Sequence, residues 1–115
     1  MLSDFPDFMK SEENAISNSS QSAGIKGWLY ESVDGKQMAY WLCEHSVVSS
    51  EHVHDFDEYF VVVQGEYTLL FSGREVIVNQ GDEYHITKGV PHAGRARAGT
   101  RTIHCFGGKR AEISK

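Results

Sequence analysis

The sequence predicts an all-β fold of the sandwich or barrel type, and two observations support that prediction. From Gly24 onward, short runs rich in Val, Ile, Tyr, Phe, Trp and Thr alternate with turn residues such as Asp34-Gly35 and Ser72-Gly73. No stretch shows the apolar spacing of a long helix. Many short strands separated by turns are typical of antiparallel sandwiches and barrels.

The expected strands follow one another with short connections. We expect them at residues 25–31, 38–44, 51–54, 58–64, 67–71, 75–78, 83–86, 92–96 and 101–106. The clearest hairpin turns at Ser72-Gly73, because glycine adopts a positive φ without steric cost.

The chain divides into one domain and two terminal pieces. Its 115 residues are enough for a single domain. Residues 1–23 are rich in Ser, Asn and Glu, and we expect a polar, loosely held segment with one short helical turn around residues 8–13. Residues 24–110 then form the domain, and residues 111–115 a short tail.

Composition narrows the partners and the compartment. The net charge of −5, with scattered signs, argues against a nucleic-acid partner, which requires a basic patch. No apolar run approaches the ~20 residues of a membrane-spanning helix. The acidic N-terminus lacks the apolar region of a signal peptide. We therefore expect a cytoplasmic protein without membrane contact. In a reducing cytosol Cys43 and Cys105 are free thiols, either small buried apolar side chains or a thiol near a metal pocket.

Three histidines and one glutamate form a candidate metal-ligand set. His52 and His54 are two residues apart, which places them on the same face of a strand, with Cα atoms roughly 6.5–7 Å apart. Glu58 follows four residues later, and His92 comes after the turn at Gly89-Val90-Pro91.

These residues carry a resemblance to the cupin superfamily. The first cupin motif is similar to His52, His54, Glu58 and Gly65, and the second to Gly81, Gly89, Pro91 and His92. The resemblance covers residues 28–106. It departs from the family pattern at three positions that are not metal ligands, namely Ser46, Thr87 and Ala96. The resemblance implies a cupin-type double-stranded β-helix, or jelly roll, which brings His92 beside His52 and His54.

The same resemblance implies one divalent metal ion. Imidazole and carboxylate ligands suit Fe, Mn, Ni, Zn or Cu, and the spacing does not choose among them. Four protein ligands leave two positions open on an octahedral ion, which is a catalytic pattern because structural sites are usually closed.

Other side chains have more open roles. His104 and Tyr84 are our candidates for moving a proton, and His45 and His104 could equally be hydrogen-bond partners of the ligands, surface residues or core residues. The strand parity of Glu58 makes Phe60 and Val62 the expected apolar wall. Further wall candidates are Tyr40, Trp41, Tyr84 and Phe106. Surface or anion-binding arginines are expected at Arg95 and Arg97, and turn residues at Asp55 and Asp57.

Two classes of function fit these features. The first is a metalloenzyme acting on a small polar oxygenated molecule, of the dioxygenase, isomerase, lyase or decarboxylase type, as the resemblance implies. The second is a non-catalytic module that binds or senses a small ligand. The resemblance also implies a homodimer.

Overall fold

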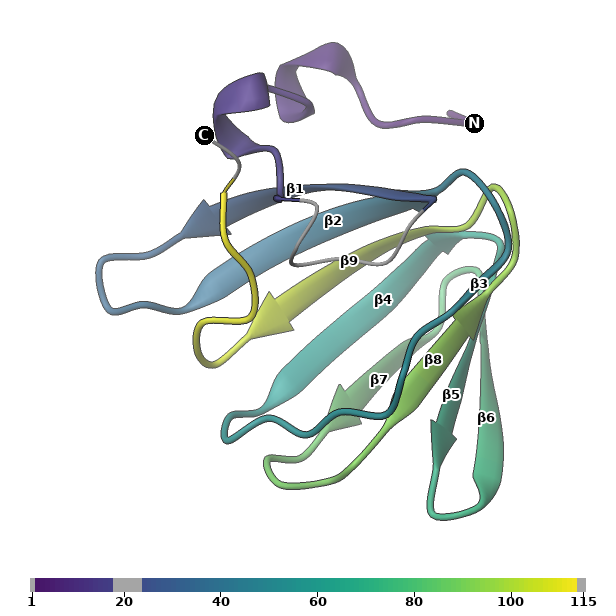
Figure 1. Cartoon of the computed structure of the whole chain (residues 1–115). Coiled ribbons are helices and arrows are strands. Elements are labelled where there is room, and N and C mark those ends of the chain that lie inside the picture. Colours follow the sequence, from purple (N-terminus) through teal and green to yellow (C-terminus); the bar gives the residue numbers. More distant parts are fainter. Residues whose placement is uncertain (1, 18–23, 114–115) are drawn as a thin grey trace.

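The molecule consists of two antiparallel β-sheets that face each other, which confirms the all-β prediction (Figure 1). The computed structural model describes residues 2–17 and 24–113. One sheet has the strand order β1-β2-β9-β4-β7 and the other the order β3-β8-β5-β6. No helix in those residues is long and apolar enough to cross a lipid bilayer.

The strands lie close to their expected positions. They are β1 (Ile25–Glu31), β2 (Gln37–Cys43), β3 (Val47–Val48), β4 (Glu58–Gln64), β5 (Glu66–Phe71), β6 (Arg74–Asn79), β7 (Glu83–Ile86), β8 (Ala93–Ala96) and β9 (Arg101–Phe106). The strand expected at residues 51–54 is absent, and β3 was not expected. Instead of a ladder, residues 51–54 contribute one isolated bridge, between His52 and His92.

The hairpin expected at Ser72-Gly73 is present between β5 and β6. Ser72 has φ 52° and Gly73 has φ 71°, while Phe71 pairs with Arg74. Two residues with positive φ between paired strands match a type I′ hairpin turn.

Alternation along the strands sends one set of side chains between the sheets. Phe60 and Val62 of β4 are completely buried there, beside Leu69 of β5. On β9, Thr102, His104 and Phe106 share the inner face, because Phe60 is paired with His104 in the ladder. The same alternation places Glu58 at the inner face where β4 begins.

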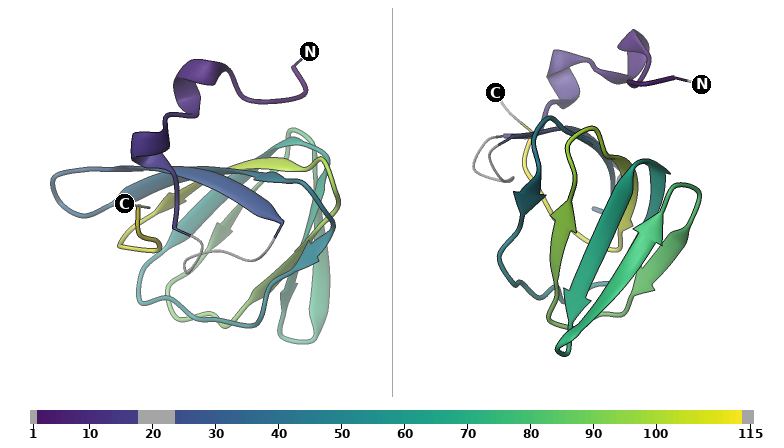
Figure 2. Two further views of the ribbon diagram at one scale, coloured as in Figure 1. Left: turned by 45° about the horizontal axis from the view of Figure 1, so that its top comes forward. Right: turned by 90° about the vertical axis from the view of Figure 1, so that its right-hand side faces the viewer.

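The N-terminal segment packs on the outer face of the five-stranded sheet (Figure 2). It contains two 3-10 turns, η1 (Asp7–Met9) and η2 (Glu12–Asn14), in place of the single expected turn. Phe5 is buried against Tyr40, with ring centroids 5.1 Å apart, and Ile16 is buried in the apolar cluster around Leu29. Residues 2–17 therefore differ from the expected loosely held segment, and its end at residue 23 lies outside the described residues.

The C-terminal residues also pack onto the sheet. Ala111 is buried, and Ile113 forms a β-bridge with Ile16. The buried side chain of Gln37 accepts hydrogen bonds from the backbone N–H groups of Arg110 (2.7 Å) and Ala111 (3.1 Å). The expected tail at residues 111–115 is thus held as far as Ile113, and residues 114–115 lie outside the described part.

Candidate metal centre

His52, His54 and His92 form a cluster that can hold a metal ion. Their candidate ligand atoms all lie within 4.8 Å of one another. His52 and His92 are brought together by their backbones, since His52 N–H donates to His92 O (2.8 Å) and His92 N–H donates to His52 O (2.9 Å). His54 stands two residues further along the same extended segment.

Two backbone carbonyls orient the imidazoles. Nδ1 of His52 donates to Ser50 O (2.9 Å), and Nδ1 of His92 donates to Val90 O (2.8 Å). A carbonyl oxygen can only accept, so each Nδ1 carries the proton and each Nε2 keeps its lone pair. This arrangement is common among metal-binding histidines.

Three buried polar atoms near the cluster have no hydrogen-bond partner among the described residues. They are His54 Nε2, His92 Nε2 and Glu58 Oε1. Glu58 Oε1 lies 3.5 Å from both nitrogens. Two ligands at ~2.1 Å from one ion would be about 3.0 Å apart at an angle near 90° and about 3.4 Å apart at an angle near 110°. These atoms therefore fit a shared cation, and without one they are costly to bury.

The other oxygen of Glu58 is paired with His104. Nδ1 of His104 lies 2.8 Å from Glu58 Oε2, and its Nε2 lies 3.0 Å from Thr102 Oγ1. Burial raises the pKa of Glu58, but the hydrogen bond with His104 and the nearby imidazole of His92 outweigh it and leave the pKa below its usual value. Glu58 is thus a carboxylate at neutral pH.

Burial also keeps two of the imidazoles uncharged. It lowers the pKa of His54 to about 4 and lowers that of His52 as well. For His92, burial alone would lower the pKa, but Glu58 and the Val90 carbonyl raise it overall. Neutral His52 and His54 can donate their lone pairs to a metal at pH 7 without first losing a proton.

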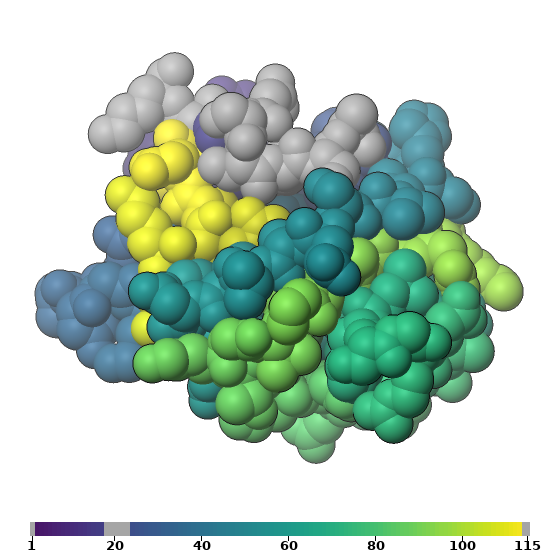
Figure 3. Space-filling model, turned by 60° about the horizontal axis from the view of Figure 1, so that its bottom comes forward, coloured from purple at the N-terminus to yellow at the C-terminus, as the bar shows by residue number. Residues whose placement is uncertain are grey.

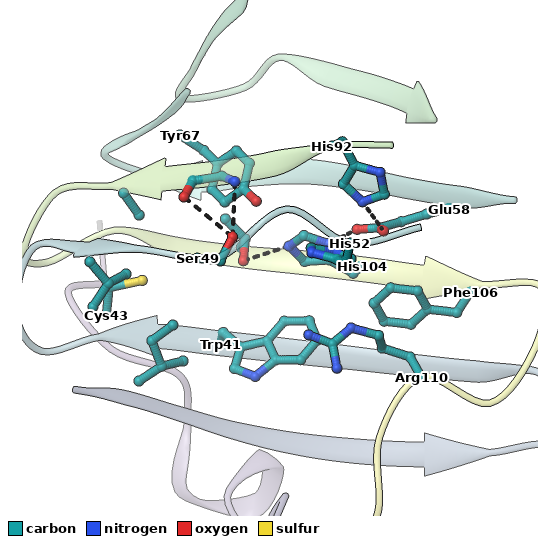
Figure 4. Close-up of a pocket in the computed structure, with 15 residues that line it drawn as sticks. Trp41, Cys43, Ser49, His52, Glu58, Tyr67, His92, His104, Phe106 and Arg110 are labelled. Atoms are coloured by element: carbon teal, nitrogen blue, oxygen red, sulfur yellow. Dashed lines mark hydrogen bonds and ion pairs between the residues drawn. The ribbon is translucent and has the colours of Figure 1, made fainter. Parts of the chain in front are cut away.

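A cavity of about 90 Å³ opens beside these residues, between the two sheets (Figure 4). Trp41 and Phe106 line it, as expected from the sequence. Phe60 and Val62 do not line it: they are buried in the core, where the Phe60 ring stacks on His104 with centroids 5.0 Å apart. Their inward parity was predicted correctly, but the expectation that they form the wall of the cavity was wrong.

Tyr84 and Tyr40 also lie away from this cavity. Tyr84 lines a second cavity with Leu69, Phe71 and His92. Tyr40 faces the opposite side of its sheet, against Phe5 and Trp28. His104 lines the main cavity and contacts Glu58, so it is the one of our two proton-transfer candidates that the structure brings to the site.

The remaining candidates have local roles. His45 and His85 are exposed, and Cys43 lines the far end of the cavity, while Cys105 is exposed. Asp57 holds the turn before β4 by accepting from the backbone N–H of Lys88 (2.9 Å). The exposed arginines and their carboxylate neighbours are Arg95 with Glu75 and Arg97 with Glu66.

Several cavity residues were not identified from the sequence, among them Ser49, Tyr67 and Arg110. Ser49 and Tyr67 come from the four-stranded sheet side, and Arg110 comes from the C-terminal segment. None occupies a defining position of either motif. The glycine at position 94 is explained by Tyr67. A Cβ at Gly94 would lie 1.8 Å from the Tyr67 hydroxyl oxygen, so the tyrosine needs a glycine there.

Comparison with known proteins identifies the family. The family model of the cupin domain matches residues 41–106, so the chain belongs to the cupin superfamily. No curated protein matches the chain.

Solved structures share the fold. KdgF from Halomonas sp. superposes with a TM-score of 0.66 at 19% identity, covering 79% of this chain and 89% of that one. An RmlC-like cupin from Shewanella frigidimarina NCIMB 400 gives 0.69 at 19% identity, covering 83% and 84%. A salicylate 1,2-dioxygenase from Pseudaminobacter salicylatoxidans gives 0.67 at 12% identity, and the match covers 74% of this chain but 26% of that enzyme. The expected cupin-type jelly roll is thereby confirmed.

Proposed function

We propose that this protein is a metal-dependent cupin enzyme that acts on a small oxygenated molecule. The observation that supports it most strongly is the group of three buried atoms without hydrogen-bond partners, His54 Nε2, His92 Nε2 and Glu58 Oε1. Buried polar atoms normally have partners, and one cation would satisfy all three. We assign the ligands as His52, His54, His92 and Glu58, and the ion as a divalent transition metal, Fe, Mn, Ni, Zn or Cu.

The cavity supports an enzyme rather than a structural metal site. It reaches the ligand cluster, so a small molecule in it would lie next to the ion. When bound, such an ion polarises an oxygen atom of the substrate and lowers the pKa of a bound hydroxyl group. The salicylate dioxygenase that shares the fold is named for a small hydroxy acid, which agrees with this class of substrate.

The residues of the chain would have separate tasks. The carbonyls of Ser50 and Val90 hold the imidazoles of His52 and His92 in one orientation. His104 orients Glu58 through Nδ1, and we assign it as the group that takes up or returns a proton. Trp41 and Phe106 exclude water from one wall of the cavity.

Metal content tests the assignment. Purified protein should contain about one divalent ion per chain by elemental analysis, and His54→Ala with His92→Ala should remove it. His45→Ala is the matched control, because His45 is exposed and outside the cluster. Equal metal content in all three proteins would contradict the proposed site. Full metal content without turnover or binding of any small oxygenated molecule would contradict the enzyme.

A further inference from the structure

Three hydroxyl groups line the cavity beside the histidine cluster, and the fold uses only two of them. They belong to Ser49, Tyr67 and Thr102. Ser49 Oγ accepts from Gly94 N–H (2.9 Å), and Thr102 Oγ1 lies 3.0 Å from His104 Nε2. The Tyr67 hydroxyl makes no hydrogen bond within the described residues. Since tyrosine hydroxyls inside proteins usually have a partner, this group is available to a molecule in the cavity.

The ring of Tyr67 is held firmly in place. It stands edge-on to the ring of Phe60, with centroids 5.0 Å apart, and to the imidazole of His104, with centroids 6.1 Å apart. Its strand β5 lies between β6 and β8, where Tyr67 pairs with Val78 and Ala96. Because both the backbone and the ring are fixed, the hydroxyl can bind a ligand at little further cost in conformational entropy.

Gly94 of β8 makes room for this hydroxyl without pairing with it. A Cβ at Gly94 would lie 1.8 Å from the hydroxyl oxygen and 2.3 Å from Cζ of Tyr67. The polar backbone groups of Gly94 pair with Ser49 instead, since Ser49 N–H donates to Gly94 O (2.8 Å) and Gly94 N–H donates to Ser49 Oγ (2.9 Å). The chain thus places a hydroxyl group at a glycine and leaves it unpaired there, which is the arrangement that a ligand-binding group requires.

The hydroxyl and the proposed metal centre share one cavity. Figure 4 shows the Tyr67 hydroxyl directed into the space that His52 and His92 also border. On the surface, Figure 3 shows the C-terminal segment lying against residues 45–57, so segments distant in sequence border this space together. The cavity measures about 90 Å³, so a molecule that fills it contacts both the histidine cluster and Tyr67.

The chemistry of the group makes it a hydrogen-bond donor. The pKa of a tyrosine is ordinarily about 10, and burial raises the pKa of Tyr67 further, so the phenol keeps its proton at neutral pH. A phenol can donate its proton and can also accept through its oxygen. Oxygen atoms that approach a cation are electron-rich and accept hydrogen bonds. A molecule bound at the centre through oxygen therefore calls on Tyr67 as a donor.

We propose that Tyr67 is a substrate-binding residue of this cavity, whose hydroxyl donates a hydrogen bond to an oxygen atom of the molecule bound at the centre. This inference rests on the proposed function and adds to it a residue that neither motif defines. The task of Tyr67 is orientation, because a single donor of fixed position selects which oxygen of the substrate faces β5. The rings of Trp41 and Phe106 form another part of the wall.

The first measurement separates this role from a structural one. Tyr67→Phe removes one oxygen atom and keeps the ring that packs on Phe60 and His104. A hydroxyl without a partner in the protein adds little to folding, so the urea midpoint of the metal-free protein should stay the same or rise. A clearly lower midpoint would show that the hydroxyl is bonded within the protein and would contradict the inference.

The second measurement is the affinity of the zinc-loaded full-length protein for acetohydroxamate. This small molecule binds metal ions through two oxygen atoms and carries a negative charge when bound. By calorimetry, Tyr67→Phe should bind it about tenfold more weakly than the wild type or worse, the loss expected for a hydrogen bond to a charged group. Tyr84→Phe is the matched control, because Tyr84 lines the second cavity and not this one, and it should bind like the wild type.

A spectroscopic measurement observes the hydroxyl directly. In zinc-loaded protein with ¹³C at Cζ of its tyrosines, the signal of Tyr67 is the one missing from Tyr67→Phe. Donation to an oxygen anion gives the phenol part of the character of a phenolate, so this signal should move downfield when acetohydroxamate is added. The signal of Tyr84, assigned with Tyr84→Phe, should stay in place.

The possible failures are distinguishable. If Tyr67→Phe holds zinc and binds acetohydroxamate as tightly as the wild type, or if the Tyr67 signal does not move, the inference is overturned while the metal site stands. If the wild type holds no zinc, or holds zinc and does not bind acetohydroxamate, the proposed function is overturned and the inference with it. The zinc content of Tyr67→Phe shows whether its metal site is intact.

Discussion

Replacing His104 by leucine should destabilise the metal-free protein by about 3–5 kcal/mol at pH 7. The side chains of Glu58 and His104 are 8% and 7% exposed and are joined by a 2.8 Å hydrogen bond. Glu58 Oε1 has no hydrogen-bond partner among the described residues. The substitution also removes His104 from Oε2, so neither oxygen of the buried carboxylate is then paired with His104 or with a cation. Leucine fills most of the volume that the imidazole occupies between Phe60 and Trp41. The expected loss of stability therefore comes mainly from breaking the Glu58–His104 pair.

The substitution should also change how the free energy of unfolding depends on pH. In the wild type the pKa of Glu58 is depressed, so its contribution to stability is present above the unfolded-state pKa and is lost as pH falls. In His104→Leu, burial without a partner raises the pKa above the unfolded-state value. The variant should therefore gain stability relative to the wild type as pH falls from 7 to 5.

Urea unfolding with a chelator present measures both effects. The matched control is Glu58→Gln combined with His104→Leu, in which no charge is buried, and it should be more stable than His104→Leu alone at pH 7. Added metal should recover much of the loss in His104→Leu, because the cation pairs with Glu58. A cost below about 1 kcal/mol, or a double variant no more stable than the single one, would refute the reasoning.

Further predictions concern the thiols, the histidines and the N-terminal segment. Cys105 is exposed, and burial raises the pKa of Cys43 to about 11, so a maleimide at pH 7.5 should label Cys105 far faster, as read by mass spectrometry. The pKa of His54 is about 4 in the folded metal-free protein, below its value of ~6.5 in the unfolded chain, so acid titration should show stability falling as pH drops from 6.5 to 4. Phe5→Ala should cost about 3–5 kcal/mol in urea unfolding and speed proteolysis before residue 17, because Phe5 is buried on Tyr40; an unchanged midpoint would show that the segment is not part of the fold.

Local rules predicted the strands best where both alternation and turn chemistry were strong. The ranges 25–31, 58–64, 83–86 and 101–106 match the structure. Residues 51–54 do not form a strand, because His52 makes a single bridge to His92 and the chain then turns toward Glu58. Buried positions in residues 2–17 were missed, since Phe5 and Ile16 are isolated apolar residues in a polar segment and carry no periodic signal.

The centre was predictable to the extent that it lies in the two motifs. The spacing of His52, His54 and His92 identified the cluster, whereas the partner of Glu58 depended on the ladder that sets β9 beside β4. Arg110 could not be found from spacing. It reaches the cavity through contacts of the C-terminal segment with Gln37 and Phe56, which are tertiary and leave no pattern in the sequence.

The claim of a metal centre is tested most directly by anomalous diffraction from a crystal grown with a divalent transition metal. We expect one strong peak per chain within bonding distance of Nε2 of His52, His54 and His92, with Glu58 Oε1 as the fourth protein ligand. The peak should disappear in crystals of His92→Ala. A peak at another site, such as exposed His85 beside Asp57, or no peak at the three histidines would contradict the account.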